Sequence, residues 1–330
     1  MNAAPITAPM RFKVDGWEVG YGSAMDVDDL TMSQAVVELD VEVPEGLWKP
    51  VGATAAVAVP DAVLFVDGVR RIDARVWINE GDDTTATMGI CASYAAGVVS
   101  CCAGRAEVVR PECKRGVFSA VSFAEDIETS AGVYEFCKVE ERPPRPLPVV
   151  LSSALQEELA RIEVETASTA REALAGGGIY DDLLIIDGPL RGREHLQRAV
   201  GYIKSHNRFY LPPELNAMVA SMTAGQRTPV FRMGTTWNRH AWYLRLPCAA
   251  GAPWAGVVRV EANARLSADE VVALANLTQT VLPRYASAEY KDARAPQNLY
   301  PIAGLEKNLR HRLGDQQFVY RALRKAAHST

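Results

Sequence analysis

The chain has 330 residues, of which 48% are hydrophobic and 23% are charged, and its net charge is −5 at pH 7. This composition is typical of a globular protein with a sizeable core, and it lacks the overall positive charge of histone-like DNA binders. The six cysteines form no CxxC pair, and neither a signal peptide nor an apolar stretch of about 18 residues is apparent. We therefore expect a cytoplasmic protein with reduced thiols and no membrane span.

The first half of the chain is predicted to be rich in strands. Residues 1–60 form a lead-in with one strand, because Val36–Val43 alternates between apolar and polar residues. The run Val63–Gly68 (VLFVDG) is continuously apolar up to its aspartate, which is typical of a strand buried on both faces. Residues 70–79 continue this strand or begin an antiparallel return, and residues 84–102 are predicted to form a third strand. Strands in succession without an intervening helix indicate a meander.

A helix and a second apolar run follow a proline-rich connector at residues 142–148. Residues 108–141, before the connector, are expected to hold a strand and a variable excursion. The later elements expected in chain order are a helix from Ser152 or Ser153 to about Leu174, a strand at Leu183–Gly188 (LLIIDG), a short helix at 194–198, a strand at 199–203, a helix at 216–223, strands at 229–233, 241–246 and 256–260, a helix at 267–280 with Ser267 and Glu270 as a capping box, and one helix at 305–324.

The order βββ–α–β–α–β is the topology of ribonuclease H-like folds. We therefore predict an α/β protein with a mixed sheet flanked by helices, extra strands and C-terminal helices. The ribonuclease H-like domain would cover residues 61–315 with the connector inside it, and residues 316–330 would be a helix end and tail.

Each of the two apolar runs ends in Asp-Gly, at Asp67 and at Asp187. A carboxylate at the end of a buried strand is costly unless something pairs with it, and a metal ion is one such partner. Ribonuclease H-like nucleases hold divalent ions with an Asp on the first strand, an acid on the first helix and an Asp on the fourth strand. Such ions activate water and stabilise the leaving oxygen during attack at phosphorus.

The predicted helix offers two acids, Glu163 and Glu165. The residues predicted to face the core of this helix recur at helical spacing: Leu155, Leu159, Ile162, Thr166 and Ala170. This stripe favours Glu163, which lies nearer the buried face. The short sequence distance to the strand aspartate that is usual in this architecture favours Glu165. Glu165 is slightly preferred, and the choice stays open.

The residues around these motifs resemble the NurA nucleases. The set consists of Val66–Arg70 (VDGVR), Ile186–Leu190 (IDGPL), a strand ending in Lys204 and a late Leu299-Tyr300-Pro301. NurA proteins carry an Asp-Gly-Ser motif followed by an Asp-Gly-Ser-Leu motif at roughly this separation. The resemblance spans about residues 60–315, although each motif is short.

The resemblance implies a manganese-dependent nuclease, with two Mn²⁺ or Mg²⁺ ions, that cuts single-stranded DNA and works on duplex ends in the 5′ to 3′ direction. It implies a homodimer that docks on a HerA-type hexameric ATPase, in DNA end processing or defence. Asp67, Glu165 or Glu163, and Asp187 would be metal ligands. Contacts with DNA would come from Arg70, Lys204, Tyr300, Arg310 and His311, with Lys204 at a phosphate.

The sequence departs from the NurA pattern in two places. The serines of the two motifs are replaced by Val69 and Pro189, which removes hydroxyls but no metal ligand. The late histidine of the family falls on Asn308, and His311, one helical turn on, is the possible substitute.

Other interpretations compete with this one. Asp-Gly is common in strand-end turns, single helix glutamates are usually solvated, and arginines on a last helix usually face water. A ribonuclease H-like scaffold without catalysis, acting as an adaptor for a ring ATPase, is a rival that would bind Mn²⁺ weakly. A small-molecule phosphohydrolase is a second rival, although Val69 stands where the haloacid dehalogenase type has its second aspartate.

Overall fold

The computed structural model describes residues 35–53, 57–79, 86–206, 209–248 and 251–328. Parts of the predicted lead-in, residues 1–34 and 54–56, lie outside the described residues. The chain forms two compact units: unit 1 contains the described residues up to 59 and those from 202 to 299, and unit 2 contains residues 60–201 and 300–328. No helix in the described part is long and apolar enough to cross a bilayer.

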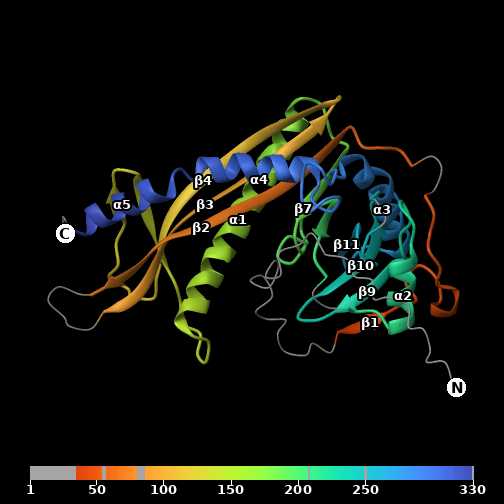
Figure 1. Cartoon of the computed structure of the whole chain (residues 1–330), viewed down its shortest axis with the longest axis horizontal. Helices are drawn as coiled ribbons and strands as arrows, with labels where there is room; N and C mark the ends of the chain where they lie inside the picture. The colour runs from red at the N-terminus through yellow and green to blue at the C-terminus, as the bar shows by residue number, and fades with distance from the viewer. Residues whose placement is uncertain (1–34, 54–56, 80–85, 207–208, 249–250, 329–330) are drawn as a thin grey trace, which may run out of the picture. The chain divides into compact units, whose positions relative to one another are not determined.

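Unit 2 is a mixed sheet flanked by helices (Figure 1). Its elements are β2 (Ala62–Ile78), β3 (Thr87–Cys102), β4 (Arg105–Ser119), β5 (Ile127–Thr129), β6 (Gly132–Lys138), α1 (Leu147–Gly176), β7 (Asp182–Asp187), α4 (Tyr300–Arg312) and α5 (Gln316–Ala327). β8 (Ala199–Ile203) begins in this unit.

The strand order of unit 2 is that of a ribonuclease H-like sheet. β2, β3 and β4 form an antiparallel meander, and β7 pairs in parallel with the free side of β2. The order β8-β7-β2-β3-β4 then places the fourth strand beside the first, and β6 and β5 extend the far edge. The predicted fold class is therefore confirmed, and a parallel β2–β7 pair requires the long crossover that contains α1.

Helices α1 and α4 cover opposite faces of this sheet. Ala96 packs in the cluster that α1 contributes to, whereas a side chain at the neighbouring Gly97 would lie 3.3 Å from Leu305 and Leu309 of α4. Successive residues of a strand point to opposite faces, so the two helices lie on either side of β3. Figure 1 shows both helices crossing the long strands.

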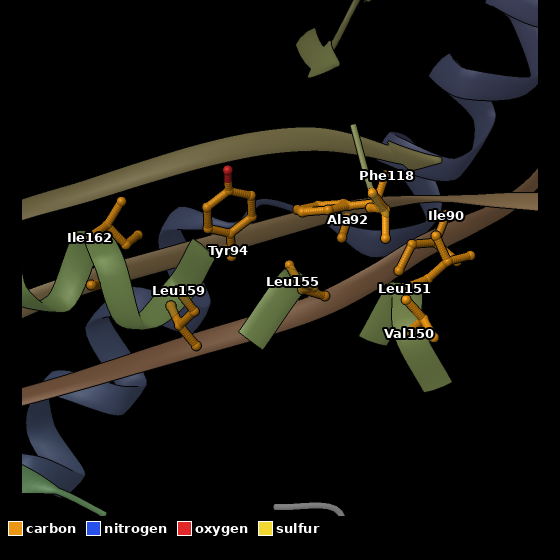
Figure 2. Packing of buried hydrophobic residues seen from close by; sticks show 11 residues of the cluster. Ile90, Ala92, Tyr94, Phe118, Val150, Leu151, Leu155, Leu159 and Ile162 are labelled. Atoms are coloured by element: carbon orange, nitrogen blue, oxygen red, sulfur yellow. The ribbon is translucent and has the colours of Figure 1, made fainter. Parts of the chain in front are cut away.

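The apolar stripe of α1 forms the core on its face of the sheet. Leu155 and Leu159 pack among Ala92, Tyr94 and Phe118 of β3 and β4 (Figure 2). The rings of Tyr94 and Phe118 lie 6.1 Å apart in a tilted arrangement. Because this stripe sets the rotation of α1 about its axis, it also decides which of its polar residues face the sheet.

Leu155→Ala is expected to lower the free energy of unfolding by about 2–5 kcal/mol, because it leaves a cavity in this core. Leu155 is fully buried. Urea unfolding followed by circular dichroism measures the change. Glu157→Ala on the exposed side of the same helix is the control, expected to stay within about 0.5 kcal/mol of wild type. A similar loss in both variants would contradict the packing described for α1.

Several boundaries in unit 2 differ from the prediction. Residues 70–78 continue β2, which is one of the two alternatives left open by the sequence. The strand predicted at 84–102 covers residues 87–102 and is the second strand of the meander, and the third strand is residues 105–119, which the sequence pattern did not resolve. Helix α1 begins at Leu147 after the N-cap Pro146, before the predicted serines, because proline is tolerated in the first turn.

Two predicted helices also differ from the structure. Residues 194–198 form turns, since Gly192 takes a positive φ of 77° and Leu196 N–H donates to Arg193 C=O. The last helix is broken into α4 and α5, because Gly314 has a φ of 79° and the Asp315 side chain caps α5 through Phe318 N–H.

Unit 1 is built on the antiparallel strand order β1-β9-β10-β11. Its elements are β1 (Val36–Glu38), η2 (Glu45–Leu47), α2 (Pro213–Ser221), β9 (Phe231–Gly234), β10 (Asn238–Arg245), β11 (Val257–Asn263), α3 (Ala268–Val281) and η3 (Leu282–Tyr285). The capping box of Ser267 and Glu270 is confirmed. The first strand is shorter than predicted, because Asp40 turns the chain by accepting a hydrogen bond from Glu45 N–H.

His206 of unit 1 is expected to make stability depend on pH. Its ring lies 5.0 Å from that of Trp254 and 5.7 Å from that of Tyr243, and its Nε2 lies 2.8 Å from Val257 C=O. Burial lowers the pKa of His206 to about 4 from an ordinary 6.5. The unfolded chain therefore takes up a proton near pH 6.5, the folded chain does so only near pH 4, and stability falls in that window as pH is lowered.

His206→Phe, which keeps the ring contacts, should remove up to about 3 kcal/mol of this pH dependence. Urea unfolding of the wild type and the variant at pH 7, 5.5 and 4 measures it. Parallel stability curves for the two proteins across this range would contradict the expectation.

Candidate active site

Asp67 lies within β2, just after its parallel pairing with β7 ends, and Asp187 is the last residue of β7. Val66 of β2 pairs with Ile186 of β7 in parallel register, and each aspartate is the next residue. Neighbouring strands are about 4.8 Å apart, so the two carboxylates lie close together at the end of β7, a place called the strand edge from here on. Asp67 is buried and accepts a hydrogen bond of 2.8 Å from Gly68 N–H.

Glu163 reaches the same edge from α1. A Cβ atom at Gly68 would lie 2.5 Å from Glu163 Oε1, so the absence of a side chain at Gly68 makes room for this carboxylate. Glu163 is 5% exposed, and the charge of Asp187 acts on it. The structure thus gathers Asp67, Glu163 and Asp187 in one region.

Arg193 is the residue of this region that sequence reasoning missed. Its Nη2 forms an ion pair with Glu163 Oε2, and its Nη1 donates to Pro189 C=O over 3.1 Å. Arg193 is 7% exposed, and among the described residues no acceptor is within hydrogen-bonding distance of its Nε. The sequence feature that could have pointed to Arg193 is its position: it is a basic residue in the loop that follows Asp187, the last residue of β7.

The charges around Glu163 oppose one another. Burial raises the pKa of Glu163, Arg193 lowers it through charge and a hydrogen bond, and the charge of Asp187 raises it. A buried carboxylate without its partner would be costly, so the ion pair with Arg193 stabilises the ionised form in this structure.

Glu165 lies on a different side of α1. Its side chain is 47% exposed and pairs with Arg161, which also binds Glu158. Two residues that are two positions apart on a helix point in directions that differ by about 200°, so Glu163 and Glu165 cannot both face the sheet. The slight sequence preference for Glu165 finds no support in its position.

Lys204 belongs to unit 1, where it is buried in a polar network. Its Nζ donates to Asn298 Oδ1 over 3.1 Å, and Asn298 in turn donates to Asp292 Oδ2 over 2.6 Å. Gln297 Nε2 donates to the Lys204 C=O. Lys204 is therefore held by named partners inside its own unit.

Arg70 is not grouped with the carboxylates. Its Nη1 donates to Ser152 Oγ over 3.2 Å near the start of α1, and burial lowers its pKa. Ser152 lies three helical turns before Glu163, or about 16 Å along the axis.

The three predicted contacts on α4 are spread along that helix. Tyr300 begins it and is 40% exposed, whereas Arg310 and His311 are exposed in its last turn. Arg71 donates hydrogen bonds to the carbonyl oxygens of Leu313 and Gly314, the residues after that turn. Arg71 lies four residues beyond Asp67 on β2, or about 13 Å, so Arg310 and His311 lie away from the carboxylates.

The donor set at the strand edge fits a divalent ion by its chemistry. Carboxylate oxygens are the ligands that Mg²⁺ and Mn²⁺ prefer. In the part of the chain that the structure describes, no three His, Cys, Asp or Glu side chains are grouped closely enough to hold an ion. Glu163 would have to leave Arg193 to complete the set.

Comparison with known proteins found matches only among solved structures. No protein-family model and no curated protein matches the chain. The NurA nuclease from Sulfolobus solfataricus is matched with a TM-score of 0.42 and 10% identity, over 84% of this chain and 88% of that one. The family that the sequence motifs resemble is thus among the structural matches.

Two further matches are endonucleases V. The catalytic domain of the human enzyme is matched with a TM-score of 0.35 and 16% identity, over 77% of this chain and 85% of that one. The Ciona intestinalis enzyme, in complex with a 24mer DNA containing an inosine followed by a ribo-adenosine, is matched with a TM-score of 0.34 and 13% identity, over 84% and 91%. Because these TM-scores are below 0.5, the chemistry proposed below rests on the carboxylates themselves.

Proposed function

We propose that the chain is a metal-dependent DNA nuclease. The observation that supports this is the parallel register of β2 and β7, which delivers Asp67 and Asp187 to the strand edge, together with Glu163 lying against Gly68. Three carboxylates on these elements of a ribonuclease H-like sheet are suited to phosphodiester hydrolysis.

Asp67, Glu163 and Asp187 would hold the ion or ions, Mn²⁺ or Mg²⁺, and two ions are proposed by resemblance. A bound divalent ion supplies a Lewis acid that activates water and stabilises the leaving oxygen. The protein's own part is to orient the carboxylates: the β2–β7 register fixes the two aspartates, and the packing of α1 fixes Glu163.

Glu163 replaces Glu165 as the proposed helix ligand. Glu163 is buried at the strand edge, whereas Glu165 points to solvent and pairs with Arg161. Lys204 and Tyr300 stay proposals for contacts with DNA phosphates, and so do Arg70, Arg310 and His311 for the DNA path.

The biological setting is proposed from the motif resemblance alone. It comprises 5′ to 3′ exonuclease and single-strand endonuclease activity, a homodimer, and a HerA-like hexameric ATPase that feeds DNA to the nuclease. End processing in repair and defence against foreign DNA use the same chemistry.

Cleavage of end-labelled single-stranded DNA by the purified full chain tests the proposal. Cleavage is expected with Mn²⁺, and it should be absent with EDTA and in Asp67→Ala. This variant removes a proposed ligand but should still fold, because the apolar residues before it, Val63–Val66, supply the buried packing of this part of β2. Equal cleavage by Asp67→Ala would refute the assignment. Hydrolysis of a chromogenic phosphate ester without DNA cleavage would point instead to a small-molecule phosphohydrolase.

The ion pair between Arg193 and Glu163 favours a second candidate, a ribonuclease H-like adaptor of a ring ATPase that has lost catalysis. In such a scaffold an arginine would permanently fill the cation position. Mn²⁺ titration by calorimetry separates the two candidates: a nuclease binds the ion through Asp67 and Asp187, and a dead scaffold does not.

A further inference from the structure

Arg193 occupies the position beside Glu163 that a cation would need. The two side chains are both buried, at 7% and 5% exposure, and they form a direct ion pair between the loop after β7 and helix α1. Glu163 Oε2 faces the guanidinium, and Glu163 Oε1 lies against Gly68. The carboxylate therefore has one oxygen paired with Arg193 and the other facing Gly68 of β2.

Arg193 is also held from its own loop. Its Nη1 donates to Pro189 C=O, two residues after Asp187, and its backbone N–H donates to Leu190 C=O in a turn. This attachment keeps the guanidinium next to the end of β7 even when Glu163 is released. The Arg193 Nε–H group is buried and has no acceptor among the described residues, so one hydrogen-bond donor of the guanidinium stays unused while Arg193 is paired with Glu163.

Two cations cannot share Glu163 at this strand edge without strong repulsion. Unit charges a few ångströms apart repel by several kcal/mol at the effective dielectric constant of a protein site, about 4 kcal/mol at 4 Å. An ion bound by Asp67, Asp187 and Glu163 would lie next to the guanidinium in its present position. Ion binding and the Arg193–Glu163 pair thus oppose one another.

We propose that Arg193 is a built-in counter-cation that holds Glu163 in the ion-free protein and competes with the divalent ion for it. This inference rests on the proposed role of Glu163 as a ligand, and it concerns how the site is regulated. The ion-free site is neutralised and closed by Arg193, and only an ion concentration high enough to displace the guanidinium completes the donor set.

Calorimetric titration of the full chain with MnCl₂ tests the competition. Arg193→Gln is expected to bind Mn²⁺ at least about tenfold more tightly than wild type, because the competing charge is gone. Adding Glu163→Gln to this variant should abolish the gain. Arg161→Gln, which removes the arginine that pairs with Glu165 on the exposed side of α1, is the matched control and should bind as wild type.

Unchanged or weaker Mn²⁺ binding by a folded Arg193→Gln would overturn the inference. A measurement on the wild type covers the case in which this variant does not fold. The Arg Nε–H NMR signal that disappears in Arg193→Lys should shift when Mg²⁺ is added, while the signal of Arg161 should not. An Arg193 signal that stays fixed at saturating Mg²⁺ would equally overturn the inference.

The outcomes separate this inference from the nuclease proposal. Tighter Mn²⁺ binding by Arg193→Gln without DNA cleavage by any variant supports the counter-cation and refutes the nuclease. Metal-dependent cleavage with equal Mn²⁺ affinities in wild type and Arg193→Gln supports the nuclease and refutes the counter-cation. No Mn²⁺ binding by either protein refutes both.

Discussion

Glu163→Gln is expected to reduce cleavage of single-stranded DNA by at least about 100-fold, whereas Glu165→Gln should stay within about twofold of wild type. The two residues are neighbours on one helix and carry the same functional group, so the pair is internally matched. Glu163 lies buried at the strand edge beside Gly68, and Glu165 is half-exposed beside Arg161. Of the two, only Glu163 lies where it could reach an ion held as proposed by Asp67 and Asp187.

Initial rates with Mn²⁺ on an end-labelled oligonucleotide measure this difference. Glutamine keeps the shape of the side chain and an oxygen that accepts from Arg193, so thermal melting should show that Glu163→Gln still folds. Loss of activity in Glu165→Gln with full activity in Glu163→Gln would reverse the assignment. Equal activity in wild type, Glu163→Gln and Glu165→Gln would show that neither glutamate of α1 takes part in cleavage.

Gly68→Ala is the second change with a large expected effect, because it acts on the fold and on the site together. The added Cβ would lie 2.5 Å from Glu163 Oε1 and 2.7 Å from Leu159 Cδ1. Helix α1 must shift, or Glu163 must turn away from the strand edge. We expect a loss of about 1–3 kcal/mol in the free energy of unfolding, and a fall in cleavage of at least about tenfold from the displaced carboxylate.

Gly304→Ala is the matched control, since nothing lies within 4 Å of a Cβ at this position of α4. It should stabilise the protein by about 0.5–1 kcal/mol, because alanine is the better helix former, and it should leave cleavage unchanged. Urea unfolding measures the change in stability of Gly68→Ala and Gly304→Ala, and initial cleavage rates measure the change in their activity. Wild-type stability and activity in Gly68→Ala would show that Glu163 does not depend on the space at Gly68.

Local patterns in the sequence were sufficient for the strands that carry the two aspartates. Each apolar run is continuous because both faces of this part of its strand are buried, and each is followed directly by its aspartate. The capping box of α3 is equally local, because Ser267 and Glu270 bond one another across three residues. Such features depend on near neighbours in the chain.

Boundaries that depend on distant packing were harder to predict. β2 continues through Arg70 and Arg71 to Ile78, because β3 pairs with it along its whole length.

The break between α4 and α5 is a different case, because its signal is local. Gly314 and Asp315 mark the break, but the leucines at helical spacing just before them suggested one continuous helix.

The sequence by itself determined the mixed α/β fold, in which a meander is followed by a helix and further strands, and it placed Asp67 and Asp187 directly after two buried apolar runs. It did not locate the third strand of the meander, residues 105–119. It left open which glutamate of α1 faces them, because that choice depends on the rotation of a helix about its axis. Packing of Leu155 and Leu159 against β3 settles the rotation and turns Glu163 inward. The pairing of Arg193 with Glu163 was decided by the tertiary structure for a related reason: the two residues are 30 positions apart in the chain, and only the folded sheet brings the loop and the helix together.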